Sequence, residues 1–480
     1  MKNGVVLITY ADSFGGDLKS LRANLDHYFS GCVSGIHILP FFPSSGDRGF
    51  SPVSYAEPDP AFGTWSDIAD LGRSYEIMAD FMVNHLSRQS MYFKDWLLHE
   101  QDSACADLFL PLEKVFGGEA PKKEEISKIY RRQPTEPWVK IRFPSGAERK
   151  IWCTFSKDQI DIDIASGPGI RLFREALRRF AESGIKTVRL DAVGYIVKKR
   201  GTTCFMVEPE IWELLDKLNR IAGEYDIELL PEMHEHYSFQ LKMASRNYRV
   251  YDFALPLLLL YSFHAQDFKP LKNWFSICPR RQFTTLDTHD GIGVVDAADL
   301  LTPEQTEFTI DKLYKTGSNV KRRYSSAEYN NVDIYQINCT YYSALGEDDD
   351  AYIMARAIQF FAPGIPQVYY VGLLAGRNDL SLVEATKNGR DINRHNYTAE
   401  EIAAESGRPV VKRLKRLMEF RMNCRAFEGS FSLGRDTPGS RLELSWEGKA
   451  ETAVLTADLQ EGRVKITLSR GDGSVLEFKP

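Results

Sequence analysis

Paired cysteines are absent from this sequence. Its seven cysteines are scattered, with no CxxC pair and no cluster of cysteine with histidine. Such a set argues against a disulfide framework and a zinc site, and it favours reduced thiols in the cytoplasm. Long hydrophobic runs are also missing, because MKNGVVLITYADS and LPLLLLYSF are both too short for a signal peptide core or a bilayer span. We therefore expect a soluble, cytoplasmic protein with no membrane partner.

An excess of basic charge is missing as well. The 480 residues include 60 Lys and Arg against 66 Asp and Glu, a net charge of −6, which gives no general signal for a nucleic acid partner. The segment ITYADSFGGD lacks the GxGxxG pattern that a dinucleotide-dependent oxidoreductase needs after its first strand. Aromatic residues make up 12% of the chain, which suits either a large core or a site that stacks rings on a flat ligand.

Short apolar, β-branched segments recur along the chain, and several precede helical patterns such as DLKSLRANLDHYF and DDAYIMARAIQFF. Alternating strand and helix signals indicate an α/β protein with a parallel sheet, and eight such units favour a (β/α)8 TIM barrel over an open sheet. The eight predicted strands are Val5–Tyr10, Gly35–Pro40, Ile77–His85, Thr187–Ala192, Glu228–Met233, Val250–Leu255, Gln282–Thr288 and Gln367–Gly372.

Two connections are much longer than ordinary loops. About a hundred residues separate the third and fourth predicted strands and nearly eighty separate the seventh and eighth, so we expect structured insertions there. After RPVVKRLKRLMEFRM, the segments RLELSW, TAVLTADL, RVKITLS and SVLEFKP predict a small antiparallel β domain. The predicted organisation is a barrel of residues 1–85, 167–291 and 356–408, a B insertion at 86–166, a B′ insertion at 292–355, and a C-terminal helix and β domain at 409–480.

Polar residues end several of these strands, where a barrel of this kind meets its ligands. In TVRLDAVGY, Arg189 and Asp191 lie two positions apart and therefore share one face of the strand. The strand-end residues are Asp80, Asn84 and His85 on the third strand, Arg189 and Asp191 on the fourth, Glu232 on the fifth, and His289 and Asp290 on the seventh.

Three carboxylates from separate strands, Asp191, Glu232 and Asp290, converge on one mouth of the barrel in this topology. Glycoside chemistry needs such a set, because one carboxylate attacks the anomeric carbon while a second donates a proton and then acts as base. Arg189 on the same face favours an ionised, nucleophilic Asp191. Glu232, after Pro231 in an apolar run, is the better candidate for the proton donor. The alternative is a structural ion pair with two unrelated surface acids.

The order and residues of these motifs resemble those of the α-amylase superfamily, glycoside hydrolase family 13. The resemblance spans nearly the whole chain and implies a B domain after strand three and a C-terminal β domain. It implies that Asp191 is the nucleophile, Glu232 the acid/base and Asp290 the transition-state stabiliser. Asn84, His85, Arg189 and His289 would complete a glucose subsite. A non-catalytic barrel of this superfamily would have lost the three carboxylates that are present here.

Further segments, among them PFFPSSGDRGFSPVSY, YNNVDIYQINCTYYSALG and GRDINRH, resemble the sucrose phosphorylase group of that family. The resemblance implies sucrose and inorganic phosphate as small-molecule substrates, no cofactor, and a monomer or homodimer. It also implies that Asp47 and Arg394 hold glucose hydroxyls, that Phe50 and Phe155 wall the subsite, and that the site includes Gln159 and a mobile loop with Asp333, Tyr335 and Gln336.

A phosphorylase also needs basic groups for its dianionic acceptor. Candidates are the runs Arg131–Arg132 and Lys321–Arg323, each of which is equally well explained as a solvated loop face. Some members of the group carry Pro then Arg where this chain has Arg132 then Gln133. The phosphate side is therefore predicted more loosely, from Arg132, Gln133 and Tyr195.

The sequence leaves open which glucoside is the substrate. Arg132 could favour a substrate phosphorylated on fructose, as in sucrose 6F-phosphate phosphorylases, whereas Ile334 stands where those enzymes carry His, which favours plain sucrose. A glucosylglycerate phosphorylase, a sucrose hydrolase or a transferase would share every catalytic residue.

No metal is expected. Asp161 and Asp163 in QIDIDIAS could suggest a cation site, but calcium sites draw oxygen ligands from several loops, so we interpret this segment as structural. His234 and His236, just after Glu232, are as well explained as surface or supporting residues as by a catalytic role.

Overall fold

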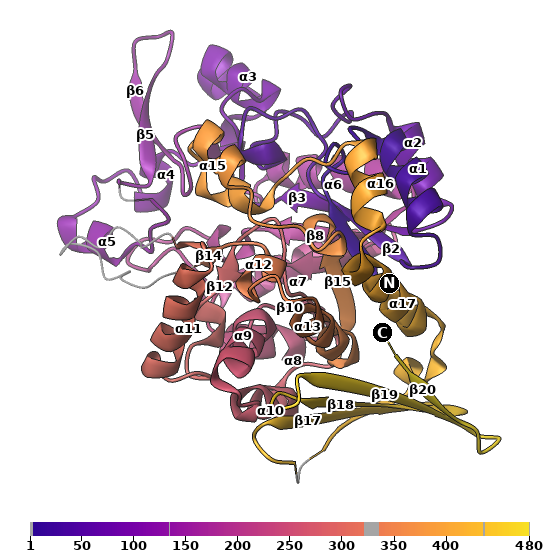
Figure 1. Ribbon diagram of the computed structural model, residues 1–480. Helices are drawn as coiled ribbons and strands as arrows, with labels where there is room; N and C mark the ends of the chain where they lie inside the picture. The colour runs from indigo at the N-terminus through magenta and orange to yellow at the C-terminus, as the bar shows by residue number, and fades with distance from the viewer. Residues whose placement is uncertain (1–2, 134, 321–335, 435–436, 480) are drawn as a thin grey trace.

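Eight parallel strands form the central sheet of the computed structural model, which describes residues 3–133, 135–320, 336–434 and 437–479. In order of pairing they are β10 (Val250–Asp252), β11 (Gln282–Thr284), β15 (Ile365–Tyr369), β1 (Val6–Thr9), β2 (Gly35–Ile38), β3 (Glu76–Met82), β8 (Ile185–Asp191) and β9 (Glu228–Pro231). Neighbouring strands pair in chain order, and the last strand of the barrel, β15, returns to pair with the first, β1. The predicted (β/α)8 barrel is therefore confirmed (Figure 1).

Helices lie outside this sheet, and nearly every strand residue is buried, as expected for a sheet covered by helices. Side-chain caps at Asp17, Thr64 and Ser166 begin three of these helices. The surrounding helices are α1 (Leu18–Tyr28), α2 (Trp65–Gly72), α6 (Gly167–Glu182), α7 (Glu210–Gly223), α8 (Tyr237–Ser245), α9 (Leu255–Ala265), α10 (Lys269–Ile277), α13 (Asp349–Phe361) and α17 (Pro409–Asn423). Within the described ranges, no helix has the length and apolar character needed to cross a bilayer.

All eight predicted strands are present, but each predicted carboxyl end lies one to four residues beyond the observed one. The third strand stops at Met82, and His85 instead begins β4 (His85–Ser87), which pairs with β7 (Gln159–Asp161) of the following insertion. The seventh strand stops at Thr284. Past β3 the backbone pairs with the insertion, since the Asn84 carbonyl accepts from the Ile162 amide over 2.9 Å, whereas past β11 the Asp287 side chain pairs with Arg356 of α13.

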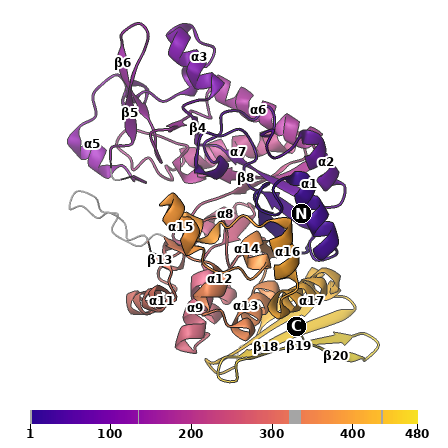
Figure 2. The same ribbon diagram turned by 45° about the horizontal axis from the view of Figure 1, so that its top comes forward.

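The segment between β3 and β8 stands beside the barrel, with a two-stranded ribbon that projects from the molecule (Figure 2). Its contact with the barrel mouth passes through β4 and β7, which place His85 next to Gln159. Its other elements are α3 (Met91–His99), α4 (Leu112–Phe116), α5 (Lys123–Lys128), β5 (Trp138–Arg142) and β6 (Glu148–Trp152).

The second long connection, between β11 and β15, also carries elements of its own. The run Lys321–Arg323, Ile334 and two predicted site residues, Asp333 and Tyr335, lie outside the described residues. The elements are β12 (Ile292–Gly293), the 3-10 turn η5 (Val295–Ala297), α11 (Pro303–Lys315), β13 (Asn319–Val320), β14 (Gln336–Asn338) and α12 (Tyr341–Ala344).

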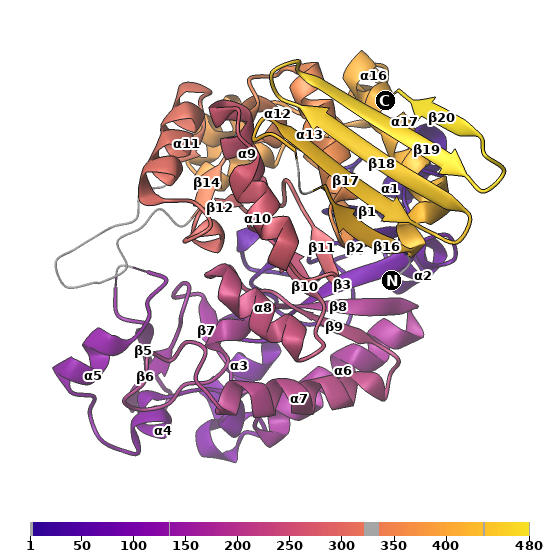
Figure 3. The same ribbon diagram turned by 90° about the horizontal axis from the view of Figure 1, so that it is seen from below.

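A five-stranded antiparallel sheet closes the chain and lies under α13 and α17, as Figure 3 shows from below. Trp446 anchors it, because its indole nitrogen donates to the Phe361 carbonyl at the end of α13 over 2.8 Å. The strands are β16 (Ser430–Leu433), β17 (Arg441–Glu447), β18 (Glu451–Asp458), β19 (Arg463–Arg470) and β20 (Val475–Phe478). Between β15 and α17 lie α14 (Tyr370–Leu373), α15 (Leu380–Thr386), the 3-10 turn η6 (Gly389–Asn393) and α16 (Ala399–Ser406).

Candidate active site

One pocket opens at the carboxyl ends of the barrel strands, and it gathers most of the predicted site residues. Arg189 and Arg394 are buried behind its wall, while Gln133 turns away and donates from Nε2 to the Cys153 carbonyl over 2.7 Å. The predicted residues that line the pocket are Asp47, Phe50, His85, Arg132, Phe155, Gln159, Asp191, Tyr195, Glu232, His289, Asp290 and Gln336.

Arg189 is the charge centre of this pocket. Its Nη1 lies 2.5 Å from Asp80 Oδ1 and 3.0 Å from Asp191 Oδ1, and its Nη2 lies 3.5 Å from Glu232 Oε1. Asp80 is held from behind by His37 Nε2 at 2.7 Å. A single buried guanidinium therefore contacts three carboxylates from β3, β8 and the end of β9.

The charge state of Asp191 differs from the sequence prediction. Burial raises the pKa of Asp191 to about 8, while Arg189 acts in the opposite direction and the neighbouring Glu232 and Asp80 raise it further. The expected dominance of Arg189 over Asp191 is therefore wrong, because that cation is shared among three carboxylates. Burial thus favours one bound proton at Asp191, and a nucleophile and acid pair needs one proton between its two carboxyl groups.

Glu232 is fixed by the chain just after Asp191. Its Oε2 accepts a hydrogen bond from the Ala192 backbone amide over 3.1 Å. Ala192 has a left-handed backbone, with φ of 58°, which is uncommon for a residue with a side chain. The turn after β8 thus aims one backbone donor at Glu232, so that the two carboxylates are placed by the same short segment.

Asp290 is set apart from the other two by its surroundings. Although burial opposes ionisation, His289, Arg390 and His234 hold the pKa of Asp290 well below its usual range. Arg390 Nη1 lies 3.5 Å from Asp290 and 3.6 Å from Asp47. Asp290 is therefore the permanently charged carboxylate of the pocket, a state that suits stabilisation of a developing positive charge.

Neutral imidazoles and an unpaired guanidinium nitrogen line the closed end. Burial lowers the pKa of His289 to about 3, and burial also lowers the pKa of His85. Arg394 donates from Nε and Nη2 to the His289 carbonyl over 3.0 and 2.8 Å. Among the described residues, buried Arg394 Nη1, Tyr10 Oη, His85 Nδ1 and His289 Nδ1 have no hydrogen-bond partner. Such unsatisfied polar atoms point to a polyhydroxylated ligand, because burying them unpaired is costly.

Aromatic rings form the walls. Phe50 stacks on His289 with ring centroids 4.8 Å apart, and Phe155 meets Tyr195 edge to face at 5.1 Å. Phe205 continues this wall beside Tyr195 at 4.9 Å, and the Arg132 guanidinium lies 6.0 Å from the Phe155 ring. The wall of Phe155, Tyr195 and Phe205 is thus apolar, with the Arg132 guanidinium at its edge.

A buried ammonium ties the insertion to the barrel beneath the pocket. Lys198 Nζ lies 2.6 Å from Asp161 Oδ2, 2.6 Å from Asn84 Oδ1 and 2.5 Å from the Tyr195 carbonyl. The other Asp161 oxygen accepts from the Thr154 amide over 2.8 Å. Asp161 is therefore a structural anchor that also fixes Asn84, next to His85.

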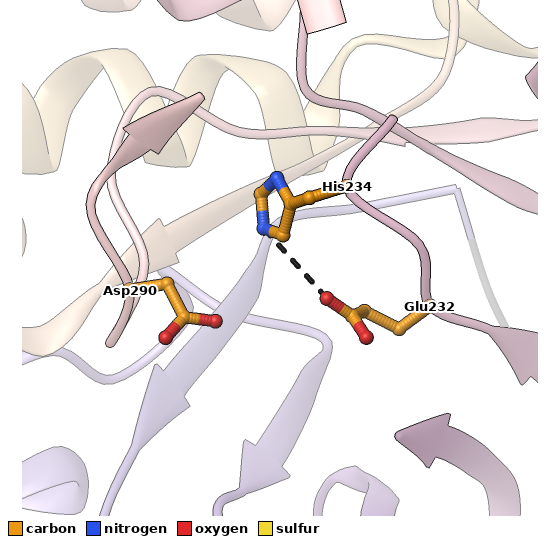
Figure 4. Close-up of side chains that lie close together, drawn as sticks. All are labelled: Glu232, His234 and Asp290. Atoms are coloured by element: carbon orange, nitrogen blue, oxygen red, sulfur yellow. Dashed lines mark ion pairs between the residues drawn. The ribbon is translucent and has the colours of Figure 1, made fainter. Parts of the chain in front are cut away.

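Glu232, His234 and Asp290 are the described residues whose grouping could hold a cation, with ligand atoms within 4.8 Å of one another (Figure 4). Each of the three already has another partner: Glu232 the Ala192 amide, His234 the Asp296 carboxylate and Asp290 the Arg390 guanidinium. We interpret the group as part of the proton-transfer site.

Several residues of the pocket were not predicted. Phe205 and Arg390 line the pocket but carry no strand-end signal, because they lie outside the barrel strands. Tyr10, whose ring meets His289 edge to face at 6.3 Å, ends the first predicted strand but was not among the predicted site residues. The sequence supports a catalytic and a supporting role for His234 equally, and it gives no signal for Asp296, which bonds His234. Because β1 is also an apolar strand of the barrel, the rule that strand ends meet the ligand could have found Tyr10.

The comparisons with known proteins point the same way. The family described as alpha amylase, catalytic domain, matches residues 3–289. A sucrose phosphorylase from Streptococcus mutans is 52% identical over 468 residues, 97% of each chain. A sucrose 6(F)-phosphate phosphorylase from Thermoanaerobacterium thermosaccharolyticum is 44% identical over 486 residues, 100% of this chain and 99% of the relative.

A crystal structure of sucrose 6F-phosphate phosphorylase superposes with a TM-score of 0.96 and 44% identity, covering 100% of this chain and 98% of that one. An α-amylase from H. orenii superposes at 0.70 with 15% identity over 96% of this chain and 90% of that one, which shows a common fold. The barrel, the arrangement of carboxylates and these matches agree, and this protein belongs to the α-amylase family, glycoside hydrolase family 13.

Proposed function

We propose that this protein is a retaining disaccharide phosphorylase that converts sucrose and phosphate to α-D-glucose 1-phosphate and D-fructose. The observation that carries the proposal is the sharing of the Arg189 guanidinium by Asp191 and Glu232 at the base of a pocket with a polar closed end. The 52% identical relative with the name sucrose phosphorylase supports the substrate.

In the first step an Asp191 oxygen attacks the anomeric carbon of the glucosyl unit. The bond from that carbon to the fructosyl oxygen breaks, and Glu232 gives its proton to that oxygen, so fructose leaves neutral. Asp290, whose Oδ1 lies 3.5 Å from the Arg390 guanidinium, stabilises the positive charge that develops on the sugar ring. Asp191 is left as a neutral β-glucosyl ester.

In the second step a phosphate oxygen attacks the same carbon from the side that fructose vacated. The ester bond to Asp191 breaks as the new bond forms, and Glu232 takes the phosphate proton. Two inversions give net retention, so the product is the α-anomer. The walls formed by Phe155, Tyr195 and Phe205 limit the access of water to the ester.

The glucosyl unit occupies the closed end in this proposal. Arg394 Nη1 and the Asp47 carboxylate supply the donor and acceptor for its hydroxyls, and the Phe50 ring, stacked on His289, supplies a flat apolar face. The acceptor side then lies toward Arg132, Tyr195 and Gln336, where fructose and phosphate alternate.

A second candidate is phosphorolysis of sucrose 6F-phosphate. It is favoured by Arg132, whose guanidinium lies at the rim of the acceptor side, and by the 44% identical relative of that name. A glucosylglycerate phosphorylase and a sucrose hydrolase remain as less favoured alternatives with the same catalytic carboxylates.

The test is release of glucose 1-phosphate from sucrose and, separately, from sucrose 6F-phosphate, with and without inorganic phosphate. The Asp191→Ala variant is the blank. We expect phosphate-dependent release from sucrose. A strong preference for the phosphorylated sugar would select the second candidate, and equal release of free glucose without phosphate would leave a hydrolase.

A further inference from the structure

A second buried ionic pair lies beside the proposed acid/base, and the mechanism above does not use it. His234 follows Glu232 by two residues, and its Nδ1 lies 3.1 Å from Asp296 Oδ2. The Asp296 side chain is 0% exposed and that of His234 is 4% exposed. Asp296 belongs to η5, after β12, so the pair joins two segments that are distant in the sequence.

The imidazole of His234 is held in one orientation by contacts on several sides. Phe253 stacks on its ring with centroids 3.8 Å apart and planes 18° from parallel. Asp296 is itself held, because its Oδ1 accepts from Gln240 Nε2 over 3.4 Å. Since Asp296 accepts at Nδ1, the ring presents Nε2 to the pocket.

Gly293 makes room for this pair. A methyl group on Gly293 would lie 2.0 Å from Asp296 Oδ2 and 3.3 Å from His234 Nδ1. Any larger residue at this position would therefore push the carboxylate away from the imidazole. Glycine at this position therefore leaves the space that the ionic pair occupies.

His234 Nε2 points at the catalytic carboxylates. It lies 3.7 Å from Glu232 Oε1, and Asp290 completes a group whose ligand atoms are within 4.8 Å of one another (Figure 4). In the described structure the charged groups that face His234 are Asp296, Glu232 and Asp290, and despite burial they raise its pKa. The Nε2 edge of this ring, whose protonation the three carboxylates favour, thus lies beside Glu232 and Asp290, the two carboxylates that are ionised after fructose leaves in the proposed mechanism.

We propose that Asp296 is a positioning residue of the second half-reaction, which keeps His234 oriented and charged so that phosphate can approach between Glu232 and Asp290. This inference rests on the proposed function. Once Glu232 has given its proton away, a phosphate dianion enters beside two negative groups, and a fixed cation between them reduces the repulsion. Water carries no charge, so its attack on the glucosyl ester depends much less on Asp296.

The experiment compares the two products of one intermediate. The Asp296→Asn variant and the wild-type enzyme receive α-glucosyl fluoride or sucrose at fixed phosphate, and the ratio of glucose 1-phosphate to glucose is measured. Because both products arise from the same glucosyl-enzyme, the ratio does not depend on how much of the variant is folded. We expect the ratio to fall by at least about tenfold, with KM for phosphate raised.

Asp299→Asn is the matched control. Asp299 pairs with His236 at 3.2 Å, yet it is 84% exposed and does not line the pocket. Its removal is expected to leave the ratio unchanged. A second readout is the His234 pKa, followed by NMR and assigned with the His234→Gln variant, which we expect to fall by about one pH unit or more in Asp296→Asn.

An unchanged product ratio in Asp296→Asn, or an unchanged His234 pKa, would overturn the inference. Both of these outcomes can be distinguished from failure of the proposed phosphorylase function. If the wild-type enzyme forms no phosphate-dependent product, the phosphorylase proposal fails first. If it does and Asp296→Asn behaves like the wild type, only the role of Asp296 fails.

Discussion

Arg189 and Asp191, two residues apart on β8, form an ion pair of 3.0 Å that is not exclusive. The same guanidinium reaches Asp80 and Glu232. This sharing leaves Asp191 without a dedicated cation, and the burial of the pocket then decides its charge. The predictions below follow from that arrangement and from the buried ammonium beneath it.

Removal of the shared cation is expected to destabilise the protein strongly. Arg189→Gln removes the buried cation that Asp80, Asp191 and Glu232 share, and removing one partner of a buried ion pair typically costs about 3–5 kcal/mol. The measurement is the urea unfolding midpoint. Arg174→Gln, which breaks an exposed pair with Glu224, is the control and should change the midpoint little.

The pH dependence of kcat/KM is expected to show an alkaline limb near pH 8. Asp191 holds a proton below its raised pKa of about 8, and the acid step needs one proton within the group of carboxylates around Arg189. Above that pH, kcat/KM for sucrose should fall by about tenfold per pH unit. The same profile with α-glucosyl fluoride, whose leaving group needs less acid assistance, should fall less. A limb more than two pH units away would contradict the assignment.

The free energy of unfolding should also fall as the pH rises, over the range below pH 8. A carboxyl whose pKa is higher in the folded than in the unfolded state stabilises the fold at low pH, and that stability is lost as the pH rises to about 8. Asp191→Asn removes this dependence. We expect its free energy of unfolding, relative to the wild type, to improve by at least about 1.4 kcal/mol between pH 5 and pH 9. A constant difference across that range would show that burial does not control Asp191.

The Lys198 ammonium is expected to hold the segment between β3 and β8 to the barrel. Lys198→Met leaves Asp161 buried without its cation and releases Asn84, so a loss of about 3–5 kcal/mol is expected. Limited proteolysis should then cut within residues 86–166 faster than in the wild type. Lys186→Met, which breaks an exposed pair with Asp226, is the matched control. Equal proteolysis of both variants would argue against this anchoring role.

Treatment with a chelator is expected to leave activity and stability unchanged. The two Asp161 oxygens accept hydrogen bonds from the Lys198 ammonium and from the hydroxyl and backbone amide of Thr154. Glu232, His234 and Asp290 each have another partner as well. Dialysis against EDTA followed by the phosphorolysis assay checks this. Lost activity that returns with added calcium would show that an ion is required.

The sequence alone determined the barrel and much of its mouth. The runs that end in RLD, LPE and THD are apolar because their strands are buried on both faces, and the residues that end a parallel strand share one edge with its neighbours. Asp191, Glu232 and Asp290 could therefore be placed in one pocket before any coordinates. The sequence did not determine where β3 and β11 end, because no local pattern marks the last ladder hydrogen bond of a strand.

Only the tertiary structure decided the pairs that tune these residues. Asp296 bonds His234 across 62 residues, and Lys198 bonds Asn84 across 114. No local pattern marks either pair, since each partner alone looks like an ordinary polar residue. The charge of Asp191 was also beyond the sequence, because it depends on three carboxylates sharing one buried guanidinium. Sequence patterns set which groups reach the pocket, whereas burial and the count of charges around them set their protonation.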